Sequence, residues 1–177
     1  MLEQLKLLIV MPILFALVTA HAEEPKRSHT ITLDDFFSLA WLSEVAISPN
    51  GQSVAYADAR WQQSTDDQKA DLWVVSTTAN EASRLTFDRA GYHGIRWSPD
   101  GKFVYAIANR KHEGASGPPY DGSTQVWRVA LAGGEPFPVT QVSGGIELFD
   151  LAADGHSVYF QTSIHNDISN CAYFGFC

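Results

Sequence analysis

Short apolar runs, each leading into a polar turn and a second apolar run, recur along the chain and predict β-hairpins. The runs before the turns are Val45–Ile47, Ile95–Trp97 and Phe149–Leu151. The runs after them are Val54–Ala57, Phe103–Ala108 and Val158–Gln161. Polar residues do not alternate regularly with apolar ones in these runs, so we expect sheets that are covered on both faces.

The turns share one phrase, which marks a repeat. It reads Ser48-Pro49-Asn50-Gly51 and then Ser98-Pro99-Asp100-Gly101, and it returns in shortened form as Ala153-Asp154-Gly155. Proline presets φ at the second turn position, and glycine supplies the positive φ that returns the chain. The glycines Gly51, Gly101 and Gly155 are 50 and 54 residues apart, a period typical of a propeller blade or a solenoid unit.

Two further strands complete each of the first two units. They follow polar connections at 60–70 and 110–124. The third strands are predicted at Leu72–Val75 and Val126–Val129, and the fourth at Ser83–Thr86 and Phe137–Thr140. Four strands in chain order per repeat predict a propeller blade. The predicted fold is all-β: a partial β-propeller over residues 44–162, with two complete four-stranded blades and the start of a third.

The first 22 residues have the layout of a secretory signal peptide. An apolar stretch, Leu7–Val18, leads to Ala20-His21-Ala22 and a polar continuation. At twelve residues the stretch is short for a membrane span. We expect cleavage after Ala22 and export to the periplasm with no membrane attachment afterwards; a retained anchor or a buried core helix is the alternative.

Residues 23–43 are expected to form an N-terminal segment with one short helix. Thr32 is a suitable N-cap for a helix from Leu33 to Ala40, and Asp35 stands where a capping box requires an acid. We expect this helix to pack on the first unit as the entry to the propeller.

The chain of 177 residues has a net charge of −8, and its basic residues are not clustered in the sequence. A basic patch is what a nucleic acid or an anionic membrane surface selects, so neither is expected as a partner.

These segments resemble the N-terminal propeller of the prolyl oligopeptidase family of serine peptidases, which includes dipeptidyl aminopeptidases and acylaminoacyl peptidases. The resemblance rests on the repeated Ser-Pro-Asp-Gly turn, on Leu33-Asp34-Asp35-Phe36-Phe37 shortly after the export signal, on Asp71-Leu72-Trp73-Val74-Val75 and on Arg84-Leu85-Thr86. It implies a propeller that admits only short or unstructured peptides to a catalytic domain. Peptide substrates are then partners of the parent enzyme.

The alternative is a binding module similar to the periplasmic propeller of the Tol system, TolB, which carries the same blade motif without being an enzyme. There an α/β domain precedes the blades, whereas here only Glu23 to Ser43 stands before the first repeat. A stand-alone module of this kind would complete its propeller by self-association.

No catalytic residue is carried over from the resemblance. The family's serine lies in a Gly-x-Ser-x-Gly elbow; the nearest sequence, Gly114-Ala115-Ser116-Gly117-Pro118, has misplaced glycines and a proline. The histidines His93, His112, His156 and His165 and the acidic pairs Glu23-Glu24 and Asp66-Asp67 lie in predicted turns, loops and polar segments. We therefore predict no catalytic site, no metal and no cofactor.

Residues 163–177 do not continue the repeat. This atypical tail holds both cysteines, Cys171 and Cys177. They could form a disulfide in an exported protein, or the tail has no structural or functional role.

A propeller closes with roughly four to eight blades, so two units and the opening of a third leave it open. The expectation is a fragment or an interrupted reading frame of a longer exported peptidase, inactive alone, marginally stable and able to self-associate through its open blade faces.

Overall fold

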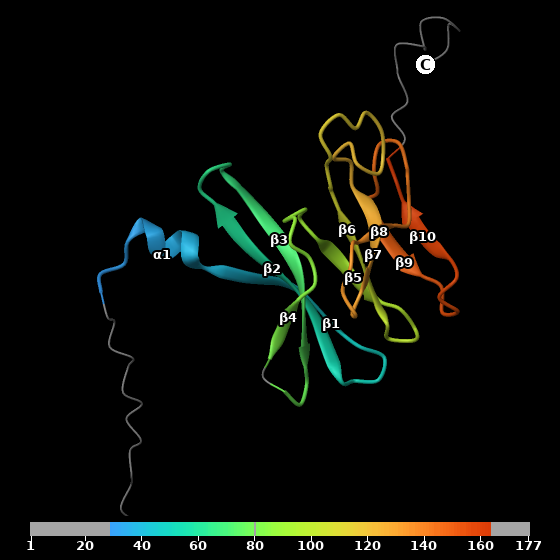
Figure 1. Cartoon of the computed structure of the whole chain (residues 1–177), viewed down its shortest axis with the longest axis horizontal. Helices are drawn as coiled ribbons and strands as arrows, with labels where there is room; N and C mark the ends of the chain where they lie inside the picture. The colour runs from blue at the N-terminus through green and yellow to red at the C-terminus, as the bar shows by residue number, and fades with distance from the viewer. Residues whose placement is uncertain (1–28, 80, 164–177) are drawn as a thin grey trace, which may run out of the picture. The chain divides into compact units, whose positions relative to one another are not determined.

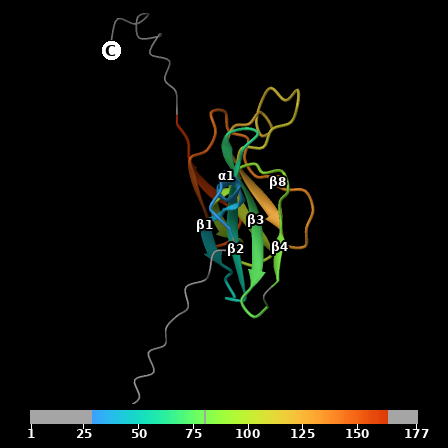
Figure 2. The same ribbon diagram turned by 90° about the vertical axis from the view of Figure 1, so that its left-hand side faces the viewer.

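The computed structural model describes residues 29–79 and 81–163 of the chain. All of its strands belong to one compact unit, Thr32–Cys177. The predicted signal peptide and the two cysteines lie outside the described residues. Within them the regular secondary structure is antiparallel sheet apart from one short helix (Figures 1 and 2).

The helix α1 spans Leu33–Ser38. The predicted capping box between Thr32 and Asp35 is present. Its Asp35 half is the bond from the Thr32 backbone N–H to the Asp35 carboxylate (2.7 Å), which also accepts the Thr32 hydroxyl (2.9 Å). The prediction that the helix continues to Ala40 is wrong. Leu39 is extended and Ala40 already pairs with Arg60 in the first sheet, so the ladder begins inside the segment assigned to the entry.

The first sheet has the strand order β1-β2-β3-β4. Its strands are β1 (Ala40–Ile47), β2 (Ser53–Gln62), β3 (Asp67–Ser76) and β4 (Ala82–Arg84). The predicted polar connection at 60–70 is mostly strand, since β2 and β3 pair as far as Gln62 and Asp67. The polar sequence concealed this hairpin because backbone pairing near the tip requires no apolar side chains.

The second sheet repeats this order as β5-β6-β7-β8, and a two-stranded sheet, β9-β10, follows. The bounds are β5 (His93–Trp97), β6 (Phe103–Ala108), β7 (Gln125–Ala130), β8 (Phe137–Pro138), β9 (Leu148–Leu151) and β10 (Val158–Gln161). The two four-stranded meanders and the opening hairpin of a third unit are thus where the repeat predicted them.

The repeated turns have one hydrogen-bonding pattern. Gly51, Gly101 and Gly155 have φ values of 70°, 69° and 71°. Each donates its backbone N–H to the carbonyl three residues before it at 2.9 Å. The predicted role of these glycines is confirmed.

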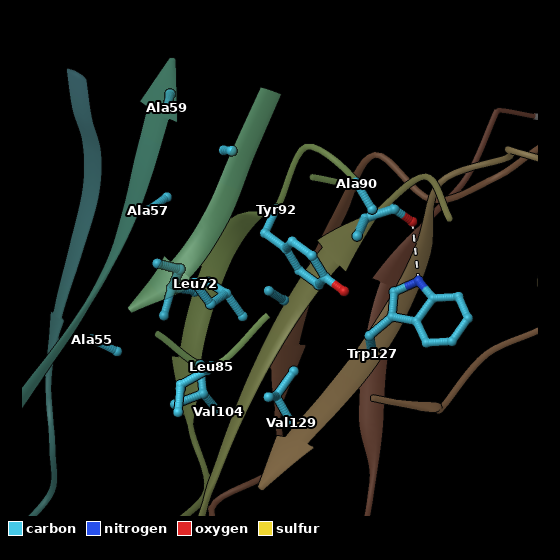
Figure 3. Packing of buried hydrophobic residues seen from close by; sticks show 14 residues of the cluster. Ala55, Ala57, Ala59, Leu72, Leu85, Ala90, Tyr92, Val104, Trp127 and Val129 are labelled. Atoms are coloured by element: carbon cyan, nitrogen blue, oxygen red, sulfur yellow. Dashed lines mark hydrogen bonds between the residues drawn. The ribbon is translucent and has the colours of Figure 1, made fainter. Parts of the chain in front are cut away.

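The first and second sheets share a core, shown in Figure 3. Alternate residues of β2, namely Ala55, Ala57 and Ala59, are buried, and these small side chains allow the neighbouring elements to approach closely. Between β1 and β5, Ile95 N–H donates to the Glu44 carboxylate (3.0 Å) and Trp97 Nε1 donates to the Ala46 carbonyl (2.9 Å).

Coverage of both faces holds for β6 but not for β1 and β2. Residues Val104 to Ala108 of β6 are all buried, because the first sheet packs on one side and β9 belongs to a second apolar cluster with Tyr105 and Ile107. In β1, Val45 and Ile47 remain 63% and 68% exposed. The difference follows from position, since among the described residues the second sheet has a neighbour on both sides and the first sheet on one.

Candidate functional site: basic pockets between the first two sheets

Two adjoining pockets lie where the long β2–β3 hairpin meets the connection into the second sheet. The hairpin pocket, about 260 Å³, is lined by Asp58, Arg60, Gln62, Lys69, Asp71, Trp73, Arg84 and Arg89. The junction pocket, about 230 Å³, is lined by Lys69, Asp88, Arg89, Ala90, Asn109, Arg110, Lys111 and His112. Lys69 and Arg89 line both, so the two pockets are neighbours that share part of their wall.

The segment between β4 and β5 builds the shared wall. Its Tyr92 N–H donates to the Ala70 carbonyl of the first sheet (3.3 Å), and its Ala90 carbonyl accepts from the N–H of Asn109, just after β6 (3.0 Å). The connecting segment is therefore attached to both sheets by its backbone. This attachment sets the positions of Asp88 and Arg89 at the pocket.

Asp71 is the buried anchor under the hairpin pocket. Its carboxylate accepts hydrogen bonds from the Thr86 hydroxyl (3.1 Å), the Arg89 backbone N–H (3.0 Å) and the Arg84 guanidinium (2.5 Å). Thr86 in turn accepts the Leu72 backbone N–H at 2.9 Å. One carboxylate thus ties β3 to the segment that follows β4.

The second sheet repeats this arrangement with an amide in place of the acid. Gln125 accepts hydrogen bonds from the Thr140 hydroxyl and the Val142 N–H, each at 2.9 Å, and Thr140 accepts the Val126 N–H at 2.9 Å. Thr86 and Thr140, which are 54 residues apart in the sequence, thus make equivalent hydrogen bonds. Gln125 is neutral, and Pro138 stands opposite Trp127 where Arg84 stands opposite Trp73, so the second sheet has no arginine at the equivalent position.

Most of the pocket cations have an acidic partner. Arg60 pairs with Asp58 at 3.0 Å, Lys69 with Asp67 at 3.0 Å and Arg84 with Asp71 at 2.5 Å. Arg110 pairs with Asp88 and Glu135. For Arg89 and Lys111, both exposed, no carboxylate partner is found among the described residues.

Arg110 forms the buried side of the junction pocket. It is 7% exposed, and its guanidinium lies 4.8 Å from the centre of the Trp127 ring. Burial opposes its charge, yet hydrogen bonds to Glu135 and Asp88 outweigh burial and raise the pKa of Arg110. Burial, followed by the charge of Asp88, raises the pKa of the neighbouring Tyr92 hydroxyl. Arg110 is thus a permanent cation whose charge is already matched.

The site has the chemistry of an anion-binding surface. No group of three or more histidine, cysteine or acidic side chains suited to a metal occurs within residues 29–79 and 81–163. Ser116, in the sequence nearest to a nucleophile elbow, is exposed in the loop between β6 and β7, and His112 stacks on Tyr120 with ring centres 4.0 Å apart. His93 Nδ1 lies 2.9 Å from the Gly91 carbonyl oxygen.

The sequence pattern does not reveal the lysines and arginines that line the two pockets, because they are scattered between residues 60 and 111. One signal was present: Arg60 and Lys69 are cross-strand partners in the extended hairpin, so extending the β2–β3 register would have paired them.

In the described part of the chain, no helix is long and apolar enough to cross a membrane.

Comparisons with known proteins show both expected resemblances. The chain is 24% identical over 134 residues to the uncharacterized peptidase YuxL of Bacillus subtilis, a match that covers 76% of this chain and 19% of that protein. No protein-family model matches. The chain thus spans about a fifth of the curated peptidase that it matches.

Solved propellers of both kinds share the fold. TolB from Acinetobacter baumannii matches with a TM-score of 0.54 and 20% identity, over 71% of this chain and 28% of that one. The acylaminoacyl peptidase of Pyrococcus horikoshii matches with a TM-score of 0.52 and 16% identity, over 70% of this chain and 17% of that one. The predicted propeller fold and the resemblance to peptidase propellers are confirmed.

Proposed function

We propose that this chain is the substrate-gating propeller portion of an exported serine peptidase. The observation that carries the proposal is the match to a peptidase over 76% of this chain but 19% of the relative. A part of that size corresponds to the sheets described above, and the chemistry of peptide hydrolysis would reside in a separate α/β-hydrolase domain. The apolar stretch Leu7–Val18 and the small residues Ala20 and Ala22 support export to the periplasm.

The gating role follows from the firm packing of the first two sheets and from the size of the substrates that could pass them. In the described residues the first two sheets share one apolar core and are joined by backbone and side-chain hydrogen bonds. A wall of this kind excludes folded proteins from a site behind it and admits short or unstructured peptides. The propeller would then select substrates without touching the reacting atoms.

An activity assay of the full chain tests the division of labour. We expect no cleavage of dipeptidyl or acylaminoacyl reporter substrates, because no Gly-x-Ser-x-Gly elbow is present in the sequence. DNA downstream of the last codon should encode further blades and a hydrolase domain in some frame. Cleavage that a serine-directed reagent inhibits would contradict the first expectation, and downstream DNA without such segments would contradict the second.

The second candidate is a non-enzymatic binding module similar to TolB. The favouring observation is the TM-score of 0.54 to TolB, close to the value for the acylaminoacyl peptidase. Such a module would act as a discrete oligomer with its sheet faces covered by other copies.

A further inference from the structure

The junction pocket holds unmatched positive charge on an acidic chain. Of its exposed cations, Arg89 and Lys111 have no carboxylate partner among residues 29–79 and 81–163, whereas Lys69 is bound to Asp67. The chain as a whole has a net charge of −8. Two unpaired cations beside one hollow are therefore available to a ligand rather than to the protein itself.

Arg89 also has an unusual backbone. Its φ is 50°, in the left-handed region that favours glycine, and its N–H is bound to Asp71. A left-handed backbone is strained for an arginine, and glycine would avoid that strain. Glycine does take positive φ twice in the same stretch, at Gly91 and Gly94. An arginine at this position therefore contributes something that the turn itself does not need, namely its side chain at the pocket.

The lining defines the ligand. A guanidinium and an ammonium group together bind a carboxylate or a phosphate. Asp88 lines the same pocket, and Asp58 and Asp71 line the adjoining one. These acids would repel a doubly charged phosphate or a polyanion more strongly than a singly charged carboxylate. The Asn109 side chain adds amide hydrogen-bonding groups suited to a peptide backbone.

We propose that the junction pocket binds a carboxylate of a peptide, held by Arg89 and Lys111. The proposal rests on the proposed peptidase function and adds a substrate class to it: peptides that carry a carboxylate, whether at the C-terminus or on an acidic side chain. Arg89 and Lys111 are binding residues in this proposal, and Arg110 pairs with Asp88 in the lining of the same pocket.

Calorimetric titration of the full chain tests this with three acetylated tripeptides. The first is tri-alanine with a free C-terminus, the second is tri-alanine amide, and the third is an amide with a central glutamate. We expect the first or the third to bind and the second not to bind, with binding weakened as salt rises from about 0.05 M to about 0.5 M. Preference between the first and third identifies which carboxylate is used. Equal binding of all three would overturn the proposal.

Three variants locate the binding site. Arg89→Gly removes the guanidinium and suits the left-handed backbone, so it should fold at least as well as the original chain. Lys111→Gln removes the ammonium. Each should weaken carboxylate binding about threefold to tenfold. The matched control is Lys102→Gln, which removes one exposed cation at the opposite end of β6 and should leave binding unchanged.

The two proposals fail separately. Peptide binding that persists in both Arg89→Gly and Lys111→Gln would exclude the junction pocket while leaving the gating role intact. Carboxylate binding that depends on both residues, together with downstream DNA lacking a hydrolase, would keep the pocket and overturn the peptidase function.

Discussion

The residue before the glycine accepts equivalent hydrogen bonds in the first two turns, although it is an amide in one and a carboxylate in the other. In the second turn the Asp100 carboxylate accepts hydrogen bonds from the Ser98 hydroxyl (2.6 Å) and the Lys102 N–H (3.1 Å). In the first turn the Asn50 side-chain oxygen accepts from Ser48 (2.8 Å) and Gln52 (3.0 Å). The turn thus needs an acceptor oxygen, and of these two copies only the second makes that acceptor titratable.

This difference predicts a pH effect. The hydrogen bond from Ser98, followed by that from Lys102, lowers the pKa of Asp100 below its ordinary 3.8. The charged form is therefore favoured in the folded state, so its contribution is present above pH 3.8 and is lost as pH falls through the lowered pKa. Asp100→Asn should make the urea midpoint fall less steeply on acidification below about pH 4.

The reciprocal exchange is the control. Asn50→Asp should add the same acid dependence to the first turn, because the donors are equivalent. Identical pH profiles for the original chain and both variants would show that Asp100 makes no such contribution.

Elements are tied together by the buried hydroxyls of Thr86 and Thr140. Each accepts a backbone N–H from the third strand of its sheet and donates to Asp71 or Gln125. These links cross between the third strand and the residues after the fourth, where β4 and β8 are only three and two residues long. Side-chain hydrogen bonds therefore fix the chain after β4 and β8 to the neighbouring strand, where backbone pairing has already ended.

Removing one such hydroxyl should destabilise its sheet. Thr86→Val keeps the shape of the side chain but leaves the Leu72 N–H without its partner, and we expect a loss of about 1 to 3 kcal/mol in the free energy of unfolding. Thr86→Ser retains the hydroxyl and should lose less. Denaturant titration measures both variants, and a larger loss for serine than for valine would contradict the assigned role.

At the scale of the whole molecule, apolar side chains on β1, β9 and β10 remain open to solvent. Val45 and Ile47 of β1 are 63% and 68% exposed, and Leu148 of β9 and Tyr159 of β10 are 64% and 68% exposed. The corresponding residues of the second sheet, Ile95 and Trp97, contact the first sheet. We expect the open faces to drive self-association of the chain.

Sedimentation velocity over a range of concentrations tests this. The double variant Val45→Lys/Ile47→Lys should shift the distribution toward the monomer, because two charges then occupy the apolar face. The control Gln52→Lys/Ala79→Lys places the same charges on exposed positions outside the strands and should leave the distribution unchanged. A discrete oligomer of the original chain favours the TolB-like module, and a heterogeneous aggregate favours the peptidase portion. A chain that stays monomeric would contradict self-association.

The sequence alone was sufficient to determine the repeat and its strands. Ser-Pro-Asp-Gly turns and apolar runs carry local signals, so β6 and β10 were predicted with their observed bounds and the helix cap was identified at Thr32. Strand ends in polar sequence were missed, as in the β2–β3 hairpin, because backbone pairing there leaves no apolar pattern.

Only the tertiary structure decided where the charges gather. The chain has no basic run, yet six of its lysines and arginines line two adjoining pockets, because the hairpin, the connecting segment and the end of β6 converge there. Which cations are neutralised is likewise a matter of distance between residues remote in sequence, as with Arg110 and Glu135. Local pattern determines strands and turns, whereas charge complementarity depends on contacts that exist only after the sheets have packed.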